Sequence, residues 1–274
     1  MHDLSLYERK IIQDKEFPVD IFKNVIQKPG IIFLPHWHEH LELHYIMKGQ
    51  GFFYCNQNPI AVEEGSLVII NSNELHKGIG STQDYEALVI IFEMNAFSKE
   101  VAEGNVVFQS HIKADQKINE LLKAIYQEEN EKRYGYKLAM KGKFYELITH
   151  LLRNYVLKSE EAKDNIRRRR NLNRLNTVMK YIQDNYSEPI TNEELAELVH
   201  VSEYRFCHLF KESLGQSPSN FINEVRLKKA YHLLEQKEMT IAEIAAAVGF
   251  QDYNNFGRLF RKYYGFAPSN VWSK

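Results

Sequence analysis

Alternating apolar and polar residues form a series of short runs across residues 17–110. Turn-forming residues separate these runs, among them Lys28-Pro29-Gly30 and Glu63-Glu64-Gly65. Many short strands at even spacing are typical of an all-β sandwich or a small barrel. The runs that predict strands are IIFLPHWH, LELHYIMKG, GFFYCNQN, SLVIIN and YEALVIIFEM.

The pattern changes near residue 112, where apolar residues begin to recur at helical spacing. One helical stripe is more apolar than a solvent-facing surface requires, and we expect it to form a homodimer contact. The next segment, LKSEEAKDNIRRRRN, is polar and charge-rich and predicts a solvated hinge, with phosphate contact by Arg167–Arg170 as the alternative. The stripe consists of Phe144, Leu147, Ile148, Leu151, Leu152 and Tyr155.

These changes of periodicity divide the 274 residues into two domains joined by a linker. From Leu172 to the end every segment predicts a helix. We expect a β-barrel over residues 1–111, a helical dimerisation segment over 112–158, a linker over 159–171 and an all-helical domain over 172–274.

The helical domain repeats itself at an offset of 49–50 residues. Thr191–Val199 aligns with Thr240–Val248, and the apolar and turn residues that follow also recur. Phe206, Leu209, Phe210, Gly215, Pro218, Ser219 and Asn220 match Phe256, Leu259, Phe260, Gly265, Pro268, Ser269 and Asn270.

Each copy contains the parts of a helix-turn-helix unit. A capping box begins the first helix, a small alanine lets the second helix cross closely, and a left-handed residue forms the turn. That turn residue is Gly249 in the second copy and His200, a type enriched at positive φ, in the first. Two such units in tandem favour duplex DNA binding over a helical repeat used for protein contacts. The other parts are Thr191, Glu194, Ala196 and Ser202, matched by Thr240, Glu243, Ala245 and Asp252.

A single helix is predicted between the copies, capped by Ser217 with Pro218 in its first turn. Its roughly 27 Å length suits two helices placed in successive major grooves about 34 Å apart. Three further motifs occur in this part of the chain, RLKKAxxLL at Arg226–Leu234, IAxxxGF at Ile244–Phe250 and FGRLFRKxxG at Phe256–Gly265. With these motifs, residues 172–274 resemble the AraC-type (AraC/XylS) regulators, in which one long helix joins two helix-turn-helix units.

Helical geometry predicts which side chains of the two second helices face outward. By the family resemblance, the outward positions nearest each helix start contact bases. Arg258 suits guanine, Asn254 suits adenine, and Tyr204 suits a thymine methyl or a phosphate. The outward set is Tyr204, Arg205, Cys207, His208, Tyr253, Asn254, Gly257 and Arg258.

The N-terminal barrel carries a histidine motif. Gly30-x5-His36-x-His38-x3-Glu42-x6-Gly49 resembles the first motif of the cupin barrels, and AraC-type regulators often carry such a barrel as their sensor. The second cupin motif is partial, because Gly65 and His76 are kept while Asn71 and Asn73 replace the usual proline and glycine.

In metal-binding cupins, residues matching His36, His38, Glu42 and His76 form a three-histidine, one-glutamate site, which suits a first-row divalent metal. In the sensor barrel of a regulator, however, we favour a metal-free pocket in which the same polar side chains bind an effector, with the metal site as the alternative. Tyr54 belongs to this expected pocket. His40, His44, Trp37 and Phe52 are further candidates to line it.

Composition limits the cellular setting. Two cysteines and the absence of a long apolar run indicate the cytoplasm, with no membrane partner. Residues 1–164 hold 19 Lys and Arg against 24 Asp and Glu, whereas residues 165–274 hold 16 against 12. Only the second part therefore favours a polyanion.

We therefore expect a DNA-binding transcription regulator controlled by a small-molecule effector in the barrel, which the family resemblance suggests is a sugar or sugar derivative. Its expected partners are double-stranded DNA, a second copy of the chain, and RNA polymerase if it activates transcription. No cofactor is required other than the candidate divalent metal. The alternative function is a metal-dependent cupin enzyme, a dioxygenase or sugar isomerase, with an appended helical domain.

Overall fold

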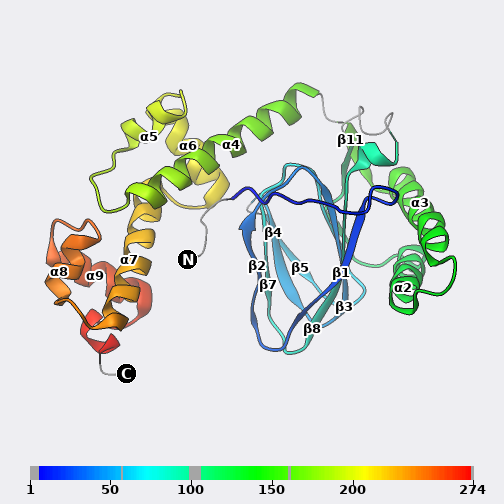
Figure 1. The fold of residues 1–274 in the computed structure, drawn as a ribbon. Helices are drawn as coiled ribbons and strands as arrows, with labels where there is room; N and C mark the ends of the chain where they lie inside the picture. Colours follow the sequence, from blue (N-terminus) through cyan, green and yellow to red (C-terminus); the bar gives the residue numbers. More distant parts are fainter. Residues whose placement is uncertain (1–5, 57, 99–105, 160–161, 273–274) are drawn as a thin grey trace. The chain divides into compact units, whose positions relative to one another are not determined.

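The computed structural model describes residues 6–56, 58–98, 106–159 and 162–272 (Figure 1). The chain divides into two compact units, Leu6–Asn173 and Arg174–Lys274, close to the predicted start of the helical domain at Leu172. Of the helices described, none combines the length and apolar character needed to cross a membrane.

Two antiparallel sheets build the first unit, as the alternating runs predict. The five-stranded sheet has the order β1-β8-β3-β6-β10, with β1 Val19–Ile26, β8 Tyr85–Phe92, β3 Leu41–Lys48, β6 Leu67–Ile70 and β10 His111–Ile112. The four-stranded sheet has the order β2-β7-β4-β5, with β2 Gly30–His36, β7 His76–Gly80, β4 Gly51–Cys55 and β5 Asn58–Val62. A separate pair joins β9 Val106–Phe108 to β11 Val156–Ser159.

Strand β3 is buried on both faces, and its alternation separates two cores. Leu41, Leu43 and Tyr45 belong to the core shared with the helices that follow the barrel. Ile46 belongs to a second core that contains residues of both sheets, including Phe53 of β4. Because successive side chains of a strand point to opposite faces, Glu42 and His44 share the inner face with Ile46.

Helices α2 Gln116–Glu131 and α3 Tyr136–Asn154 cover the outer face of the five-stranded sheet (Figure 1). The apolar stripe predicted to form a dimer contact lies here, and that assignment is wrong. Phe144 is fully buried, and its ring lies 4.8 Å from that of Phe92 in β8. The stripe is apolar because it packs on the protomer's own sheet. Its buried or partly buried members are Phe144, Leu147, Ile148, Leu151, Leu152 and Tyr155.

Helix α4 Ala162–Asn185 includes most of the predicted linker. Ser159 lies in β11, and residues 160–161 lie outside the described part. The remaining linker residues are helical and do not form the expected irregular hinge. Arginine has a high helix propensity, and neither glycine nor proline interrupts the sequence from Lys143 to Glu188.

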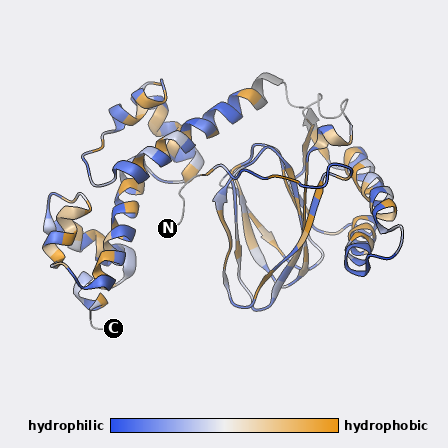
Figure 2. Cartoon of the chain, viewed as in Figure 1, coloured by the Kyte–Doolittle hydropathy of each residue, from blue (hydrophilic) through white to orange (hydrophobic). Residues whose placement is uncertain are grey.

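The second unit is all-helical, and its helices begin at the predicted caps. Its described elements are the part of α4 from Arg174 onward, α5 Asn192–Leu198, α6 Glu203–Leu214, α7 Pro218–Gln236, α8 Ile241–Ala247, α9 Tyr253–Tyr264 and the short η2 Pro268–Val271. Thr240 and Glu243 form a complete capping box. Thr191 caps α5 through the amide of Glu194, whose carboxylate instead accepts a hydrogen bond from Tyr181. Hydrophilic and hydrophobic residues are mixed along each helix (Figure 2), as expected for helices with one solvent-facing side.

Candidate functional site

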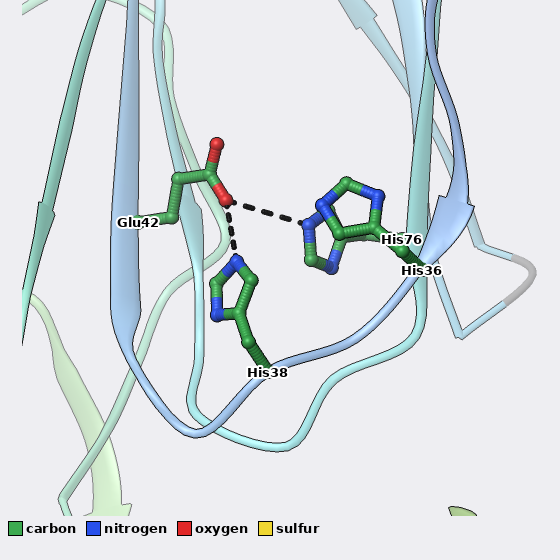
Figure 3. Close-up of side chains that lie close together, drawn as sticks. All are labelled: His36, His38, Glu42 and His76. Carbon is green, nitrogen blue, oxygen red and sulfur yellow. Dashed lines mark hydrogen bonds and ion pairs between the residues drawn. The ribbon is translucent and has the colours of Figure 1, made fainter. Parts of the chain in front are cut away.

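The four residues predicted from the histidine motif come together inside the barrel (Figure 3). His36 ends β2 and pairs with His76, which begins β7, while Glu42 lies on β3 and His38 in the loop between β2 and β3. One candidate ligand atom from each residue lies within 4.8 Å of the others. His38, Glu42 and His76 are buried, and His36 is partly buried.

Glu42 is the centre of this cluster. Its Oε2 atom accepts a hydrogen bond of 2.8 Å from His38 Nε2, and His76 Nε2 lies 3.4 Å from the same oxygen. Burial alone would raise the pKa of Glu42, but the charge of His44 and the hydrogen bonds from His38 and His44 outweigh this effect and hold that pKa well below its usual range. The carboxylate is therefore ionised, as a metal ligand must be.

Two of the histidines are oriented by backbone carbonyls. Nδ1 of His36 donates to the carbonyl of Leu34 at 2.8 Å, and Nδ1 of His76 donates to that of Glu74 at 2.7 Å. Because Nδ1 carries a proton in both rings, Nε2 is the nitrogen that each ring can offer to an ion, in His36 once that nitrogen has lost its own proton. Burial lowers the pKa of His76 to about 4, although the nearby Glu42 acts in the opposite direction. This ring is therefore neutral at pH 7.

These observations fit a divalent metal. Three imidazoles and one carboxylate suit first-row ions such as zinc, iron or nickel, whereas calcium and magnesium prefer oxygen ligands. Hydrogen bonds that fix the outer nitrogen of a ligating histidine are typical of built metal sites. The arrangement can hold an ion, and it offers no nucleophile paired with a base.

Side chains that the sequence analysis did not select as site residues complete the surroundings. The ring of Phe33 lies 5.4 Å from His36, 5.2 Å from His44 and 5.6 Å from His76. It fits against Gly78, where a Cβ would come within 2.7 Å of the ring. Glu8 accepts a hydrogen bond of 2.9 Å from Nε2 of His36. Only the register of the sheet and the path of the N-terminal segment bring these residues to the site.

Tyr54 does not line the site, and this part of the prediction is wrong. Phe53 is fully buried and faces Phe33, so its neighbours Phe52 and Tyr54 point to the outer face of the four-stranded sheet. Tyr54 packs there against Lys77, whose ammonium lies 4.5 Å from the ring centre. Phe52 is exposed on the same face.

The remaining pocket candidates have different positions. Trp37 is fully buried, and its ring lies 4.8 Å from that of Tyr7, so it serves as a core aromatic. His40 pairs with Glu93 at 3.2 Å. His44, however, points to the cluster and contacts Glu42 at 2.6 Å.

The two helix-turn-helix units have the geometry predicted from the repeat. His200 has φ 55° and Gly249 has φ 90°, so both turns use a left-handed residue. Ala196 and Ala245 are buried beneath the second helices. The inward residues of α6 and α9, namely Phe206, Leu209, Phe210, Phe256 and Phe260, are buried, and Leu259 is partly buried.

The predicted outward side chains of α6 and α9 are accessible. Tyr204, Arg205 and His208 of α6 are exposed, and Cys207 is partly exposed. Tyr253, Asn254 and Arg258 of α9 are exposed, and Gly257 is partly exposed. Two of these side chains have neighbours on their own helix, because His208 pairs with Glu212 at 3.1 Å and Arg258 donates to Asn255 at 2.9 Å.

Charge distinguishes the two helices. Helix α6 carries Arg205 and Lys211 but also Glu203 and Glu212. Helix α9 carries three basic residues, Arg258, Arg261 and Lys262, and no acidic residue. The outer face of α9 is therefore the more favourable of the two for a phosphate backbone.

Comparison with known families gives two matches. Residues 26–148 match the family described as AraC-like ligand binding domain. Residues 195–273 match the family described as Helix-turn-helix domain.

Similar proteins cover nearly the whole chain. The HTH-type transcriptional activator RhaS of Escherichia fergusonii is 24% identical over 89% of this chain and 88% of its own length. The Msm operon regulatory protein of Streptococcus mutans is 23% identical over 98% of this chain and 97% of its own. A probable AraC family transcriptional regulator from Rhodopseudomonas palustris, a crystal structure, is 34% identical over 36% of this chain and 94% of its own, with a TM-score of 0.35.

Proposed function

The chain belongs to the AraC-type transcriptional regulators, and on that premise we propose that a ligand held by the barrel's histidine cluster controls its binding to specific DNA sites. The relatives are regulators of transcription, and this chain is a regulator rather than the alternative cupin enzyme.

The exposed faces of α6 and α9 support the proposed DNA contacts. Both helices begin at side-chain caps, Ser202 and Asp252, which fix where their first turns start. We assign base contacts to Asn254 and Arg258, with Tyr204 and His208 each at a base or a phosphate. The remaining outward residues, Arg205, Cys207, Tyr253 and Gly257, lie on the same faces.

The cluster of His36, His38, Glu42 and His76 supports a divalent metal as the bound group. The observation that carries this proposal is that all four candidate ligand atoms lie within 4.8 Å of one another around an ionised, buried carboxylate. When bound, the ion would supply a positive charge beside Glu42 in place of the hydrogen bond that His38 now donates to it. These residues would hold it between β2, β3 and β7.

A sugar or sugar derivative remains the second candidate for the effector. The family resemblance favours it, and the histidine side chains offer hydrogen bonds to hydroxyl groups. The rings of Phe33, Phe53 and His44 pack within 5.5 Å of one another beside the cluster, which leaves an ion the better fit of the two. A homodimer and, for an activator, a contact with RNA polymerase also belong to the proposed function.

The test uses the full chain purified without chelator. Its metal content is measured by mass spectrometry, and duplex sites are selected from a randomised pool. We expect near-stoichiometric metal, its loss in His38→Ala, and a change of about fivefold or more in affinity for the selected site when the metal is removed. Metal content near zero after re-addition of zinc, manganese, nickel and iron would leave only the metal-free pocket. Binding to selected and scrambled duplexes that is equally tight would contradict the DNA-site proposal.

A further inference from the structure

His44 makes the closest contact to Glu42 in the cluster, although it is not one of the four candidate ligands. Its Nε2 atom donates a hydrogen bond of 2.6 Å to Oε1 of Glu42. The two residues lie two positions apart on β3, so both side chains leave the same face of the strand. His44 is as buried as His38 and His76.

The ring of His44 is held in place by two aromatic rings. Phe33 stacks on it with ring centres 5.2 Å apart and an interplanar angle of 29°. Phe53 meets it at 4.9 Å and 64°. These contacts leave the imidazole little freedom to turn away from Glu42.

Because of this hydrogen bond, the two carboxylate oxygens of Glu42 have different partners. Oε1 is occupied by His44, while Oε2 faces His38 and His76. An ion among the four ligand residues would therefore meet one oxygen of Glu42. If the hydrogen bond from His44 to Oε1 were lost, the carboxylate of Glu42 could rotate and offer both oxygens to the ion. Carboxylates bind in this two-oxygen mode to larger ions that prefer oxygen ligands.

We propose that His44 is a positioning residue of the barrel's metal site, which holds Glu42 as a one-oxygen ligand and so favours ions that accept four ligands, three of them nitrogen. This inference rests on the proposed metal site. It assigns His44 a role in metal selectivity, and no contact with the ion itself. Zinc and cobalt accept such a set, whereas manganese suits oxygen-rich ligands.

Two substitutions separate positioning from packing. His44→Phe keeps an aromatic ring between Phe33 and Phe53 but removes the donor. His44→Gln restores an N–H near the position of Nε2. His40→Gln is the matched control, because His40 is also a buried histidine paired with a carboxylate, that of Glu93.

The experiment titrates the full-length proteins with Co²⁺ and Mn²⁺ against a chromophoric chelator and records the visible spectrum of the Co²⁺ form. We expect His44→Phe to lose about 10- to 100-fold in Co²⁺ affinity, the usual cost of removing an outer-shell partner. Its preference for Co²⁺ over Mn²⁺ should fall, and its Co²⁺ absorption should weaken as the coordination number rises. His44→Gln should recover most of the affinity and the spectrum, and His40→Gln should match the wild type.

The possible outcomes distinguish the role of His44 from the existence of the metal site on which it rests. A wild-type protein that takes up neither ion overturns the metal site and the role of His44 together. A wild type that binds Co²⁺, with a folded His44→Phe variant of equal affinity and spectrum, overturns the role of His44 alone. Thermal unfolding of each variant establishes that it is folded. If His44→Phe does not fold, a folded His44→Leu variant, which also lacks the donor, takes its place, and wild-type affinity and spectrum in that variant overturn the role of His44.

Discussion

Nε2 of His36 donates a hydrogen bond of 2.9 Å to Glu8, and it is the same nitrogen that His36 would offer to a metal ion. An ion bound there must displace both this hydrogen bond and the Nε2 proton, since Nδ1 is already held by the carbonyl of Leu34. Glu8 belongs to an N-terminal segment that is itself attached to the barrel, because the amide of Glu8 donates to the carbonyl of Trp37 at 3.0 Å. Glu8 therefore competes with the ion for His36.

We expect Glu8→Gln to bind Co²⁺ or Zn²⁺ more tightly than the wild type. A neutral amide holds His36 less strongly than a carboxylate does, so less interaction is lost when the ion binds. The gain should be about three- to tenfold, because Glu8 is exposed and solvent weakens its ion pair with His36. Asp20→Asn is the control, because it disturbs the same segment through Lys10 without touching His36. Weaker binding by Glu8→Gln would instead make Glu8 an additional ligand.

Asp115 joins the start of α2 to the end of α3. Its Oδ1 atom accepts from the amide of Ile118, and its Oδ2 atom accepts from His150 at 2.8 Å and from Tyr155 at 2.6 Å. Burial would raise the pKa of Asp115, but hydrogen bonds from Tyr155, His150 and Ile118 outweigh it and lower the pKa to about 2. The charged form is thus stabilised by folding.

Asp115→Ala should lower the free energy of unfolding by about 1–2 kcal/mol at pH 7, mainly through the lost helix cap. Since the folded pKa lies below the unfolded value of about 3.9, the contribution of the charge is present above that value and disappears as the pH falls through about 2. Urea unfolding of the wild type, Asp115→Ala and Asp115→Asn at neutral and acidic pH measures the effect of the cap and that of the charge. A difference in unfolding free energy between the wild type and Asp115→Asn that does not shrink towards pH 2 would contradict the proposed role of the charge.

The sequence could predict most helices and strands of the fold, but not which part of the structure packs against each apolar face. The apolar stripe on α3 indicates that one side of the helix is buried. Either a sheet of the same chain or a second copy of the chain could bury it. Phe144 meets Phe92, some fifty residues earlier, and that contact depends on the path of the whole barrel. For α4 the helix itself was missed in the sequence. Its first part is rich in arginine and asparagine and has no apolar periodicity from which a helix could be predicted.

The candidate site shows the same division. His36, His38, Glu42 and His76 were predictable because the motif fixes their types and spacing. Tyr54 was misplaced because the parity of β4 is set by which residue, Phe53 or its neighbours, enters the core, and all three are aromatic. Glu8 reaches His36 only through a contact between segments far apart in sequence, for which the local pattern holds no signal.

Two glycines should respond oppositely to alanine. Gly249 has φ 90°, and a Cβ there would lie 2.6 Å from the carbonyl oxygen of Ser187. Gly142 lies within α3, and a Cβ there would meet nothing within 4 Å. Gly249→Ala should destabilise the protein by about 1–3 kcal/mol, whereas Gly142→Ala should stabilise it by about 0.5–1 kcal/mol. Thermal unfolding of both variants decides this, and equal melting temperatures would contradict the close approach to Ser187.

Arg258 and His208 occupy matching places on α9 and α6, but their neighbours differ. Arg258 donates to the neutral Asn255, so its charge remains available to DNA, whereas His208 pairs with the carboxylate of Glu212. Arginine also presents a planar fork that fits guanine, while histidine is a weaker and pH-dependent donor. We therefore expect Arg258→Ala to cost about 1–3 kcal/mol on the selected site and to relax preference at one base pair.

His208→Ala should cost less than Arg258→Ala and should act more evenly across sequences. Binding curves for both variants, on the selected duplex and on scrambled DNA at one fixed salt concentration, separate the two kinds of contact. A base contact is lost only on the selected duplex, because scrambled DNA never made it, whereas a phosphate contact is lost on both. Equal weakening of both duplexes by Arg258→Ala would place its guanidinium on the backbone, where the neighbouring Arg261 and Lys262 already favour phosphate, and would shift recognition of the sequence to Asn254 and the residues of α6.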